Sequence, residues 1–257
     1  MRRLGCASSL FGGPLEEALA SIARAGCEEV DLWAVPHQCE HVRPATDDPD
    51  AVAEQVRAAG LRANALSLYG CRGAQLDEGL EWAARAGVPR VVFESFGPDF
   101  RGFLEPYVAR AAQLGVEVCV ENHIDCPVDS IASARRLFEQ LDSPVLGLAY
   151  APIHTAALGE PVAQALAELA PWIRLLYVWD VPQAQSGVAW LREHWHRTGL
   201  DQLPGYGRLD FAALAPLLPD GADLSLCAHG TQDWPAARVE AELVRSRDYL
   251  RMRGWPV

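Results

Sequence analysis

Short apolar runs alternate along the chain with segments in which apolar residues recur every three or four positions. A short apolar run is typical of a strand buried on both faces, and the second pattern predicts an amphipathic helix. The predicted strands are residues 4–7, 29–33, 62–68, 90–94, 118–121, 145–149, 173–178 and 223–227. The predicted helices are residues 14–25, 48–59, 76–86, 103–114, 131–141 and 162–169.

The ends of these helices carry start and stop signals. Asp47 and Asp48 are cap candidates for one helix and Asp129 for another, because a carboxylate at a helix start can accept hydrogen bonds from the first free backbone N–H groups. Four predicted helices stop at a glycine, which reaches the left-handed conformation that ends a helix at low cost. These glycines are Gly26, Gly60, Gly87 and Gly115. The next strand begins two or three residues after each, which is the short connection of a regular barrel.

Eight strands alternating with helices in 257 residues match the size of a (β/α)8 TIM barrel in the α/β class. No stretch rich in Pro, Gly and Ser divides the chain, so one domain spanning residues 1–257 is expected. The alternative is a doubly wound open sheet. It is disfavoured because no GxGxxG motif follows the first strand, and residues 11–14 (FGGP) are typical of a helix entry.

Charge limits the partners of the chain. The formal net charge is -12 at pH 7, so a polyanion such as nucleic acid would be repelled and a small molecule is the expected partner. No apolar segment approaches the roughly 18 residues that cross a bilayer, and the first residues lack the apolar core of a signal peptide. Neither membrane association nor export is expected, and self-association into a homo-oligomer is left open.

Cysteine and lysine usage narrows the chemistry. The seven cysteines are odd in number, include no CxxC pair and fall partly inside predicted strands, which is typical of reduced thiols in a cytoplasmic protein. The chain contains no lysine at all. A Schiff-base aldolase mechanism and covalent attachment of pyridoxal phosphate are therefore excluded.

The motif at residues 118–123 (VCVENH) brings a carboxylate, an amide and an imidazole to the C-terminal end of a strand, where barrel enzymes place their chemistry. Further motifs follow the same order of strands: residues 26–33 (GCEEVDLW), 150–154 (YAPIH), 177–180 (YVWD), 205–211 (GYGRLDF) and 226–230 (LCAHG). Together they resemble the sugar phosphate isomerase/epimerase group of the xylose isomerase-like TIM barrels. The resemblance spans nearly the whole chain.

That resemblance implies one divalent cation, often Mn or Mg, held by a Glu, an Asp, a His and a second Glu, and a proton moved between sugar carbons. Glu121 matches the first ligand, whereas Ala151, Tyr177 and Cys227 stand at the other three positions. Mg and Mn require several hard oxygen ligands, so we expect no such metal and no other cofactor. A shifted site with softer ligands, built from Glu121, His154 and Cys227 with His123 or His229, would suit zinc and remains an alternative.

We expect Glu121 and His154 to perform acid–base catalysis. Glu121 would remove or relay a proton, with a pKa raised by loss of hydration, and His154 would donate to or orient the developing oxyanion, titrating near neutral pH. The alternative for Glu121 is a structural ion pair. The expected substrate-binding residues are Trp33, Tyr69, Glu94, Asn122, His123, Tyr150, Tyr177, Trp179, Cys227 and His229. The aromatic members predict a stacking pocket for a ring-shaped or apolar ligand, although some belong in the core.

The segment 182–207 is the one long connection, and it contains three aromatic residues and two histidines. A loop of this length in a compact domain is usually functional, as a substrate lid, and the alternative is a packed cover over the barrel mouth. Asp180, just before it, is expected to anchor the loop rather than to act on substrate.

Two classes of function stay open. The first is a metal-independent isomerase/epimerase-like enzyme that isomerises, epimerises, dehydrates or cyclises a small carbonyl or polyol compound. Its substrate must be more acidic than a plain sugar, because no metal polarises the carbonyl. No glycine-rich phosphate loop follows the last strands, so a phosphorylated substrate is not expected. The second class is a non-catalytic barrel that serves as a ligand-binding or partner subunit.

Overall fold

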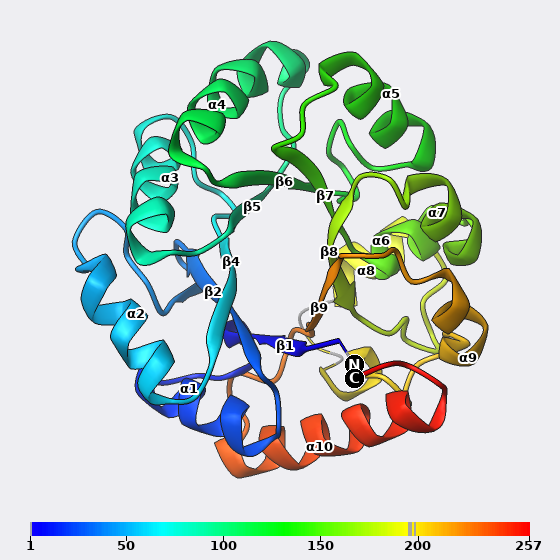
Figure 1. Ribbon diagram of the computed structural model, residues 1–257. Helices are drawn as coiled ribbons and strands as arrows, with labels where there is room; N and C mark the ends of the chain where they lie inside the picture. Colours follow the sequence, from blue (N-terminus) through cyan, green and yellow to red (C-terminus); the bar gives the residue numbers. More distant parts are fainter. Residues whose placement is uncertain (1, 195–196, 198) are drawn as a thin grey trace.

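A computed structural model describes residues 2–194, 197 and 199–257. Its centre is a closed barrel of eight parallel strands ringed by helices (Figure 1), which confirms the predicted (β/α)8 fold. The ring closes because β1 pairs with both β2 and β9. The barrel strands are β1 (Leu4–Ala7), β2 (Glu29–Val35), β4 (Arg62–Ser67), β5 (Arg90–Glu94), β6 (Glu117–Glu121), β7 (Leu146–Tyr150), β8 (Ile173–Val178) and β9 (Asp223–Leu226).

The outer helices lie where the pattern of apolar residues predicts them, within a few residues. They are α1 (Leu15–Arg24), α2 (Pro49–Ala58), α3 (Ala74–Ala86), α4 (Phe100–Leu114), α5 (Ile131–Leu141), α7 (Val162–Leu169) and α10 (Ala236–Met252). Only α10 was not predicted, because many charged residues dilute its apolar positions. It nevertheless buries Val239, Leu243 and Leu250 and lies beside α1, so that it completes the ring of helices next to the chain ends (Figure 1).

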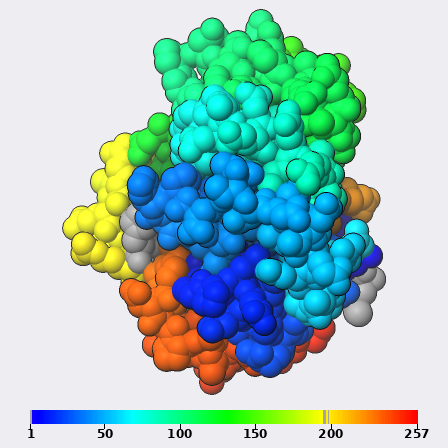
Figure 2. All heavy atoms as spheres, turned by 90° about the vertical axis from the view of Figure 1, so that its left-hand side faces the viewer, coloured from blue at the N-terminus to red at the C-terminus, as the bar shows by residue number. Residues whose placement is uncertain are grey.

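Shorter elements decorate the connections. They are η1 (Ser8–Leu10), β3 (Cys39–Glu40), α6 (Pro152–Ala157), α8 (Val188–His194), η2 (Gly199–Gln202), α9 (Phe211–Leu214) and η3 (Ala215–Leu217). Of these, α6 and α8 stand beyond the C-terminal ends of β7 and β8, whereas α9 lies in the outer ring between α7 and α10 (Figure 1). Figure 2 shows the yellow segment around α8 projecting from one side of the molecule beyond the neighbouring helices.

The helix ends largely follow the predicted signals. Gly87 and Gly115 take left-handed conformations with φ of 70° directly after α3 and α4. Asp48 caps α2 by accepting a hydrogen bond from the backbone N–H of Asp50. The cap of α5 was predicted wrongly. Ser130 is the capping residue, and Asp129 instead accepts a hydrogen bond from the Ser133 hydroxyl at 3.0 Å.

Strand register decides which side chains meet at the mouth. Glu94 of β5 is the register partner of Glu121 of β6, and Glu121 in turn is the partner of Ala149 of β7. The two residues therefore stand side by side at the C-terminal ends of adjacent strands, whose backbones lie about 4.8 Å apart in a sheet. In the described part of the chain, no helix is both long and apolar enough to span a membrane.

Candidate active site

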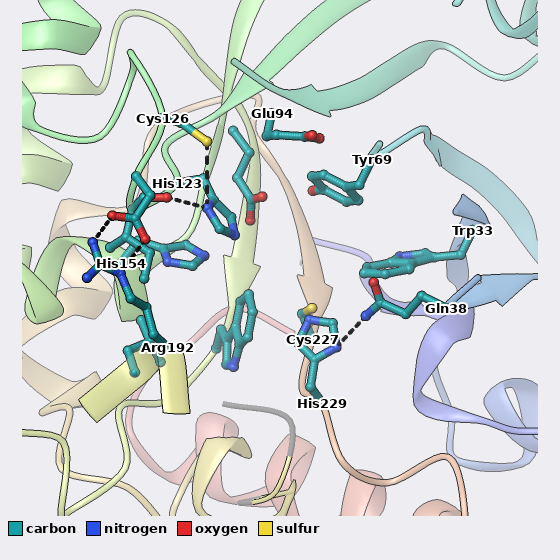
Figure 3. A pocket seen from close by; sticks show the side chains of 15 residues that line it. Trp33, Gln38, Tyr69, Glu94, His123, Cys126, His154, Arg192, Cys227 and His229 are labelled. Carbon is teal, nitrogen blue, oxygen red and sulfur yellow. Dashed lines mark hydrogen bonds and ion pairs between the residues drawn. The ribbon is translucent and has the colours of Figure 1, made fainter. Parts of the chain in front are cut away.

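A cavity of about 400 Å³ occupies the C-terminal mouth of the barrel (Figure 3). This volume is in the range of small-molecule sites. Its wall comes from seven of the eight strand ends or the loops after them. The lining residues are Trp33, Gln38, Tyr69, Glu94, Glu121, His123, Ile124, Asp125, Cys126, His154, Trp179, Leu191, Arg192, Cys227 and His229.

Glu121 is the most enclosed carboxylate of this wall, at 3% exposure. Burial raises its pKa well above the usual range, the neighbouring Glu94 adds repulsion, and a hydrogen bond from Tyr69 partly offsets both. No salt bridge joins Glu121 to an arginine within the described residues, whereas Glu94 is paired with Arg72 at 2.8 Å. Glu121 therefore favours its protonated form, and the upward direction of this pKa shift is the one expected from sequence.

His154 lies in α6, which begins at Pro152 immediately after β7. Its ring is buried at 2% exposure, and among the described residues neither ring nitrogen has a hydrogen-bond partner. Burial lowers the pKa of His154 well below its ordinary value, and the nearby His123 and His229 lower it further. The prediction that His154 titrates near neutral pH is therefore wrong, because an imidazolium here would lose its hydration.

His123 stands beside His154, with the ring centroids 4.1 Å apart (Figure 3). The Nδ1 atom of His123 lies 2.7 Å from the backbone carbonyl of Ile124. A carbonyl only accepts hydrogen bonds, so Nδ1 carries the proton and Nε2 keeps the lone pair. Burial lowers the pKa of His123 as well. Both imidazoles are thus neutral side chains near pH 7.

The cation of the resembled family does not fit this mouth. The carbonyl and N–H of Ala151, which offers no side-chain oxygen, are both bonded to the Asn122 amide at 3.1 and 2.7 Å. Tyr177 uses its hydroxyl on Tyr69 and Asp31. Burial raises the pKa of the Cys227 thiol well above its usual value, which keeps it neutral. The hard oxygen ligands required by Mg or Mn are missing at these positions.

A different donor set is present. One ligand atom each from Glu121, His123 and His154 lie within 4.8 Å of one another. Two imidazole nitrogens and one carboxylate oxygen are ligands that suit zinc. All three residues belong to the shifted site considered from sequence, whereas Cys227, which that site also included, is not in this set.

Aromatic and imidazole rings form a continuous belt around the cavity (Figure 3). Successive ring centroids are separated by 5.3 Å for Tyr69–Trp33, 5.6 Å for Trp33–His229, 5.1 Å for His229–Trp179, 5.6 Å for Trp179–His154 and 4.1 Å for His154–His123. Gln38 fixes one member of the belt, because its side-chain amide lies 3.1 Å from Nδ1 of His229. A wall of ring faces and edges favours a flat or apolar ligand.

Beneath the belt lies a buried network that the sequence analysis missed. Asp31 has no exposed surface and accepts hydrogen bonds from the hydroxyls of Ser67 at 2.8 Å and Tyr177 at 3.2 Å and from the indole of Trp33 at 3.1 Å. Burial raises the pKa of Asp31 to about 7 despite these donors. Tyr177 continues the network to Tyr69 at 2.9 Å. The signal was available, since Asp31 stands between the apolar residues Val30 and Leu32 of a buried strand.

Most of the residues expected at the site line the cavity, and three do not. Glu121, His154 and seven of the expected substrate-binding residues, namely Trp33, Tyr69, Glu94, His123, Trp179, Cys227 and His229, are in its wall. Asn122, Tyr150 and Tyr177 are buried behind it. Asn122 holds the loop after β7, and Tyr177 supports Tyr69 and Asp31. Gln38, Ile124, Asp125, Cys126, Leu191 and Arg192 are lining residues that were not expected.

The segment 182–207 contributes to the mouth through α8. Leu191 and Arg192 line the cavity, and Arg192 forms an ion pair with Asp125 on the loop after β6. Trp195 and His196, two of the residues that suggested a lid, lie outside the described residues. The anchoring role expected for Asp180 is confirmed, since its carboxylate accepts hydrogen bonds from four backbone N–H groups, those of residues 181, 205, 207 and 209.

Comparison with known proteins places this barrel in a family. The model of the xylose isomerase-like TIM barrel family matches residues 19–248. The chain belongs to this family. A search of curated proteins finds no significant match.

Solved structures agree with the family barrel. A fusion protein of a xylose isomerase-like TIM barrel with 4-hydroxyphenylpyruvate dioxygenase superposes with a TM-score of 0.78 at 22% identity, covering 98% of this chain and 43% of the fusion protein. This chain therefore spans less than half of that protein. An L-ribulose 3-epimerase gives 0.72 at 16% identity over 98% and 94% of the two chains. The 3-keto-D-glucoside 4-epimerase of E. coli gives 0.72 at 17% identity over 96% and 100%. At these identities the likeness concerns the fold.

Proposed function

We propose that the chain is an enzyme that moves a proton within a small, neutral carbonyl or polyol compound, without the Mg or Mn of its family. The observation that carries the proposal is the convergence of Glu121 and His154 in one enclosed cavity, with no arginine paired to Glu121 and no partner for His154 among the described residues. Groups with strongly shifted pKa values that meet in a cavity are typical of acid–base sites.

Burial supports a particular starting state for this pair. It favours the neutral forms, a protonated Glu121 and a neutral His154. From that state Glu121 gives its proton to the carbonyl oxygen, while His154 accepts the proton of the adjacent carbon, so that the ketone becomes an enol. Return of the proton from His154 to the other carbon or face, with return of the enol proton to Glu121, gives an isomer or epimer. If His154 instead gives that proton to a neighbouring hydroxyl, which leaves as water while the enol proton returns to Glu121, the product is dehydrated. This direction reverses the roles expected from sequence.

The lining supports a neutral ligand with a ring or another flat group. Arg192 is the only arginine among the described lining residues, and its ion pair with Asp125 leaves no cation for a phosphate or carboxylate. The belt of rings favours stacking. Without a metal to polarise the carbonyl, the substrate carbon must be more acidic than that of a plain sugar, since the missing Lewis acid is worth several kcal/mol.

The non-catalytic alternative is compatible with the barrel fold, but it does not explain the buried His154 side chain at the barrel mouth. A subunit that only binds a partner has no need for a buried imidazole without hydrogen bonds, since an unsatisfied buried polar group costs about 1–3 kcal/mol of stability. A catalytic group keeps its lone pair available for the substrate. The mouth therefore supports the enzyme more than the binding subunit.

Hydrogen exchange with solvent tests the proposal. The protein is incubated in heavy water with a panel of neutral cyclic hydroxyketones, and NMR follows replacement of the proton next to the carbonyl. We expect exchange with at least one member of the panel, and Glu121→Gln should keep the fold while lowering the exchange rate by about 10² to 10⁴, the usual contribution of a positioned acid or base. No exchange by the wild-type protein, or an equal rate in Glu121→Gln, would contradict the proposal.

A further inference from the structure

The donor atoms of Glu121, His123 and His154 lie close together, and the hydrogen bonding of the two histidines is also that of metal ligands. The hydrogen bond from Nδ1 of His123 to the Ile124 carbonyl at 2.7 Å fixes the tautomer and leaves Nε2 as the coordinating atom. A metal-binding histidine almost always has such a partner on its other nitrogen. His154, buried and without hydrogen bonds among the described residues, offers a second lone pair beside it (Figure 3).

The chemistry of these donors selects the ion. Two imidazole nitrogens and one carboxylate oxygen, with a fourth position facing the cavity, form the donor set of an open zinc site. Mg would require a nearly octahedral set of oxygens and is disfavoured. Bond lengths of 2.0–2.2 Å place tetrahedral zinc ligands roughly 3.3 Å apart. The donor atoms lie within 4.8 Å of one another, so rotation of the side chains has to close at most about 1.5 Å.

We propose that Glu121, His123 and His154 bind one Zn²⁺ ion and that this ion switches the enzyme off. The ion uses the carboxylate oxygen of Glu121 and the lone pair of His154, which are the two groups that would exchange protons with the substrate. It also occupies the part of the cavity in which they meet. The effect on rate rests on the proposed function, whereas the binding of zinc does not.

Direct titration tests the binding. The protein is treated with EDTA, desalted, and titrated with ZnCl2 by calorimetry, with MgCl2 as the control ion. We expect one Zn²⁺ per chain and no detectable Mg²⁺. His123→Ala and His154→Ala should each weaken zinc binding at least tenfold. His41→Ala should not, because His41 bonds the Gly13 carbonyl outside the cavity, and Cys227→Ser should not, because Cys227 is outside the donor set.

Melting curves without metal show whether each variant folds, and Glu121→Gln gives a third, nearly isosteric test of the donor set. Equal zinc affinity in all the variants would overturn the site.

The hydrogen-exchange assay described above then separates the zinc proposal from the proposed function. Loss of exchange in proportion to bound Zn²⁺, reversed by EDTA, supports the inference. Binding without loss of exchange overturns the inhibition. Exchange that requires Zn²⁺ overturns the metal-independent function while keeping the site.

Discussion

The two ends of the barrel treat buried charge in opposite ways. At the N-terminal ends of the strands, Arg90 is 7% exposed and donates to Glu117 at 3.0 Å and to Asp223 at 2.6 Å. At the C-terminal mouth, Glu121 and Asp31 are buried at least as deeply, and neither forms a salt bridge with an arginine in the described part of the chain. The buried arginine at the N-terminal end is paired, whereas Glu121 and Asp31 have no arginine partner among the described residues, although Glu94 beside Glu121 is paired with Arg72.

The difference indicates what each end is for. A buried charge without a partner shifts its pKa toward the neutral form, whereas a paired one holds the structure around it. In barrels of this type, the N-terminal end supports stability and the C-terminal end carries the chemistry. We therefore infer that Arg90 stabilises the fold and that Glu121 and His154 are part of the candidate active site.

The largest expected contrast is in stability. Arg90→Met should lower the free energy of unfolding by about 1.5–3 kcal/mol, because it removes charge-assisted hydrogen bonds to two partly buried carboxylates, of which Glu117 keeps Arg174 as a partner. Glu121→Gln should not lower it, because a neutral amide replaces a carboxyl whose charge is already disfavoured by burial. Urea unfolding of both variants measures the contrast. Equal losses at the two ends would remove the distinction between them.

A second effect, spread over about three pH units, is expected in the pH dependence of stability. The folded pKa of Asp31, about 7, lies above the usual value of about 3.9 for an unfolded aspartate. Between these values the folded chain keeps a proton that the unfolded chain has released, so the Asp31 contribution falls as pH rises, by up to about 1.4 kcal/mol per pH unit. The titratable groups near Asp31 include Cys6, Cys227 and Glu121. These groups are unchanged when Asp31 alone is replaced.

Asp31→Asn isolates this contribution. The difference in unfolding free energy between wild type and variant should change steadily from about pH 4 to pH 7 and then level off. Denaturant melts at several pH values measure it. Parallel curves for the two proteins would show that Asp31 is ionised over the whole range, and the mouth would then hold one uncompensated carboxyl fewer.

The barrel was predictable because each strand and most helices carry local patterns. Apolar runs bounded by glycines such as Gly87 and Gly115 locate the strands and the turns before them, and Asp48 caps the helix that it precedes. Helix α10 was missed because its apolar positions are spread among many charges, and what holds it is packing against α1. That contact is tertiary and leaves a weak trace in the local sequence.

The site was predictable only where a strand end brings a residue to the mouth. Glu121 follows its apolar strand directly, so its place was clear. Tyr150 also ends its strand, but it points away from the barrel interior, because a one-residue step from Ala149, the register partner of Glu121, reverses the side chain. Tyr177 does point into the barrel, but it lies beneath the cavity, where it bonds Tyr69 and Asp31. Gln38 comes from the connection after β2, and Arg192 comes from the short helix α8 within the long connection after β8; no strand or helix periodicity predicted either position. The low pKa of His154 depends on burial by residues far away in sequence.

Removal of metal by chelation tests most directly whether the candidate site catalyses proton exchange without the Mn or Mg of its family. The protein is dialysed against EDTA, its Mn and Mg contents are measured by elemental analysis, and proton exchange is followed before and after Mn²⁺ or Mg²⁺ is added. With Ala151, Tyr177 and Cys227 at three ligand positions, we expect no stoichiometric Mn or Mg, full exchange after chelation, and no gain from either ion. Exchange that disappears on chelation and returns with Mn²⁺ or Mg²⁺ would contradict the account.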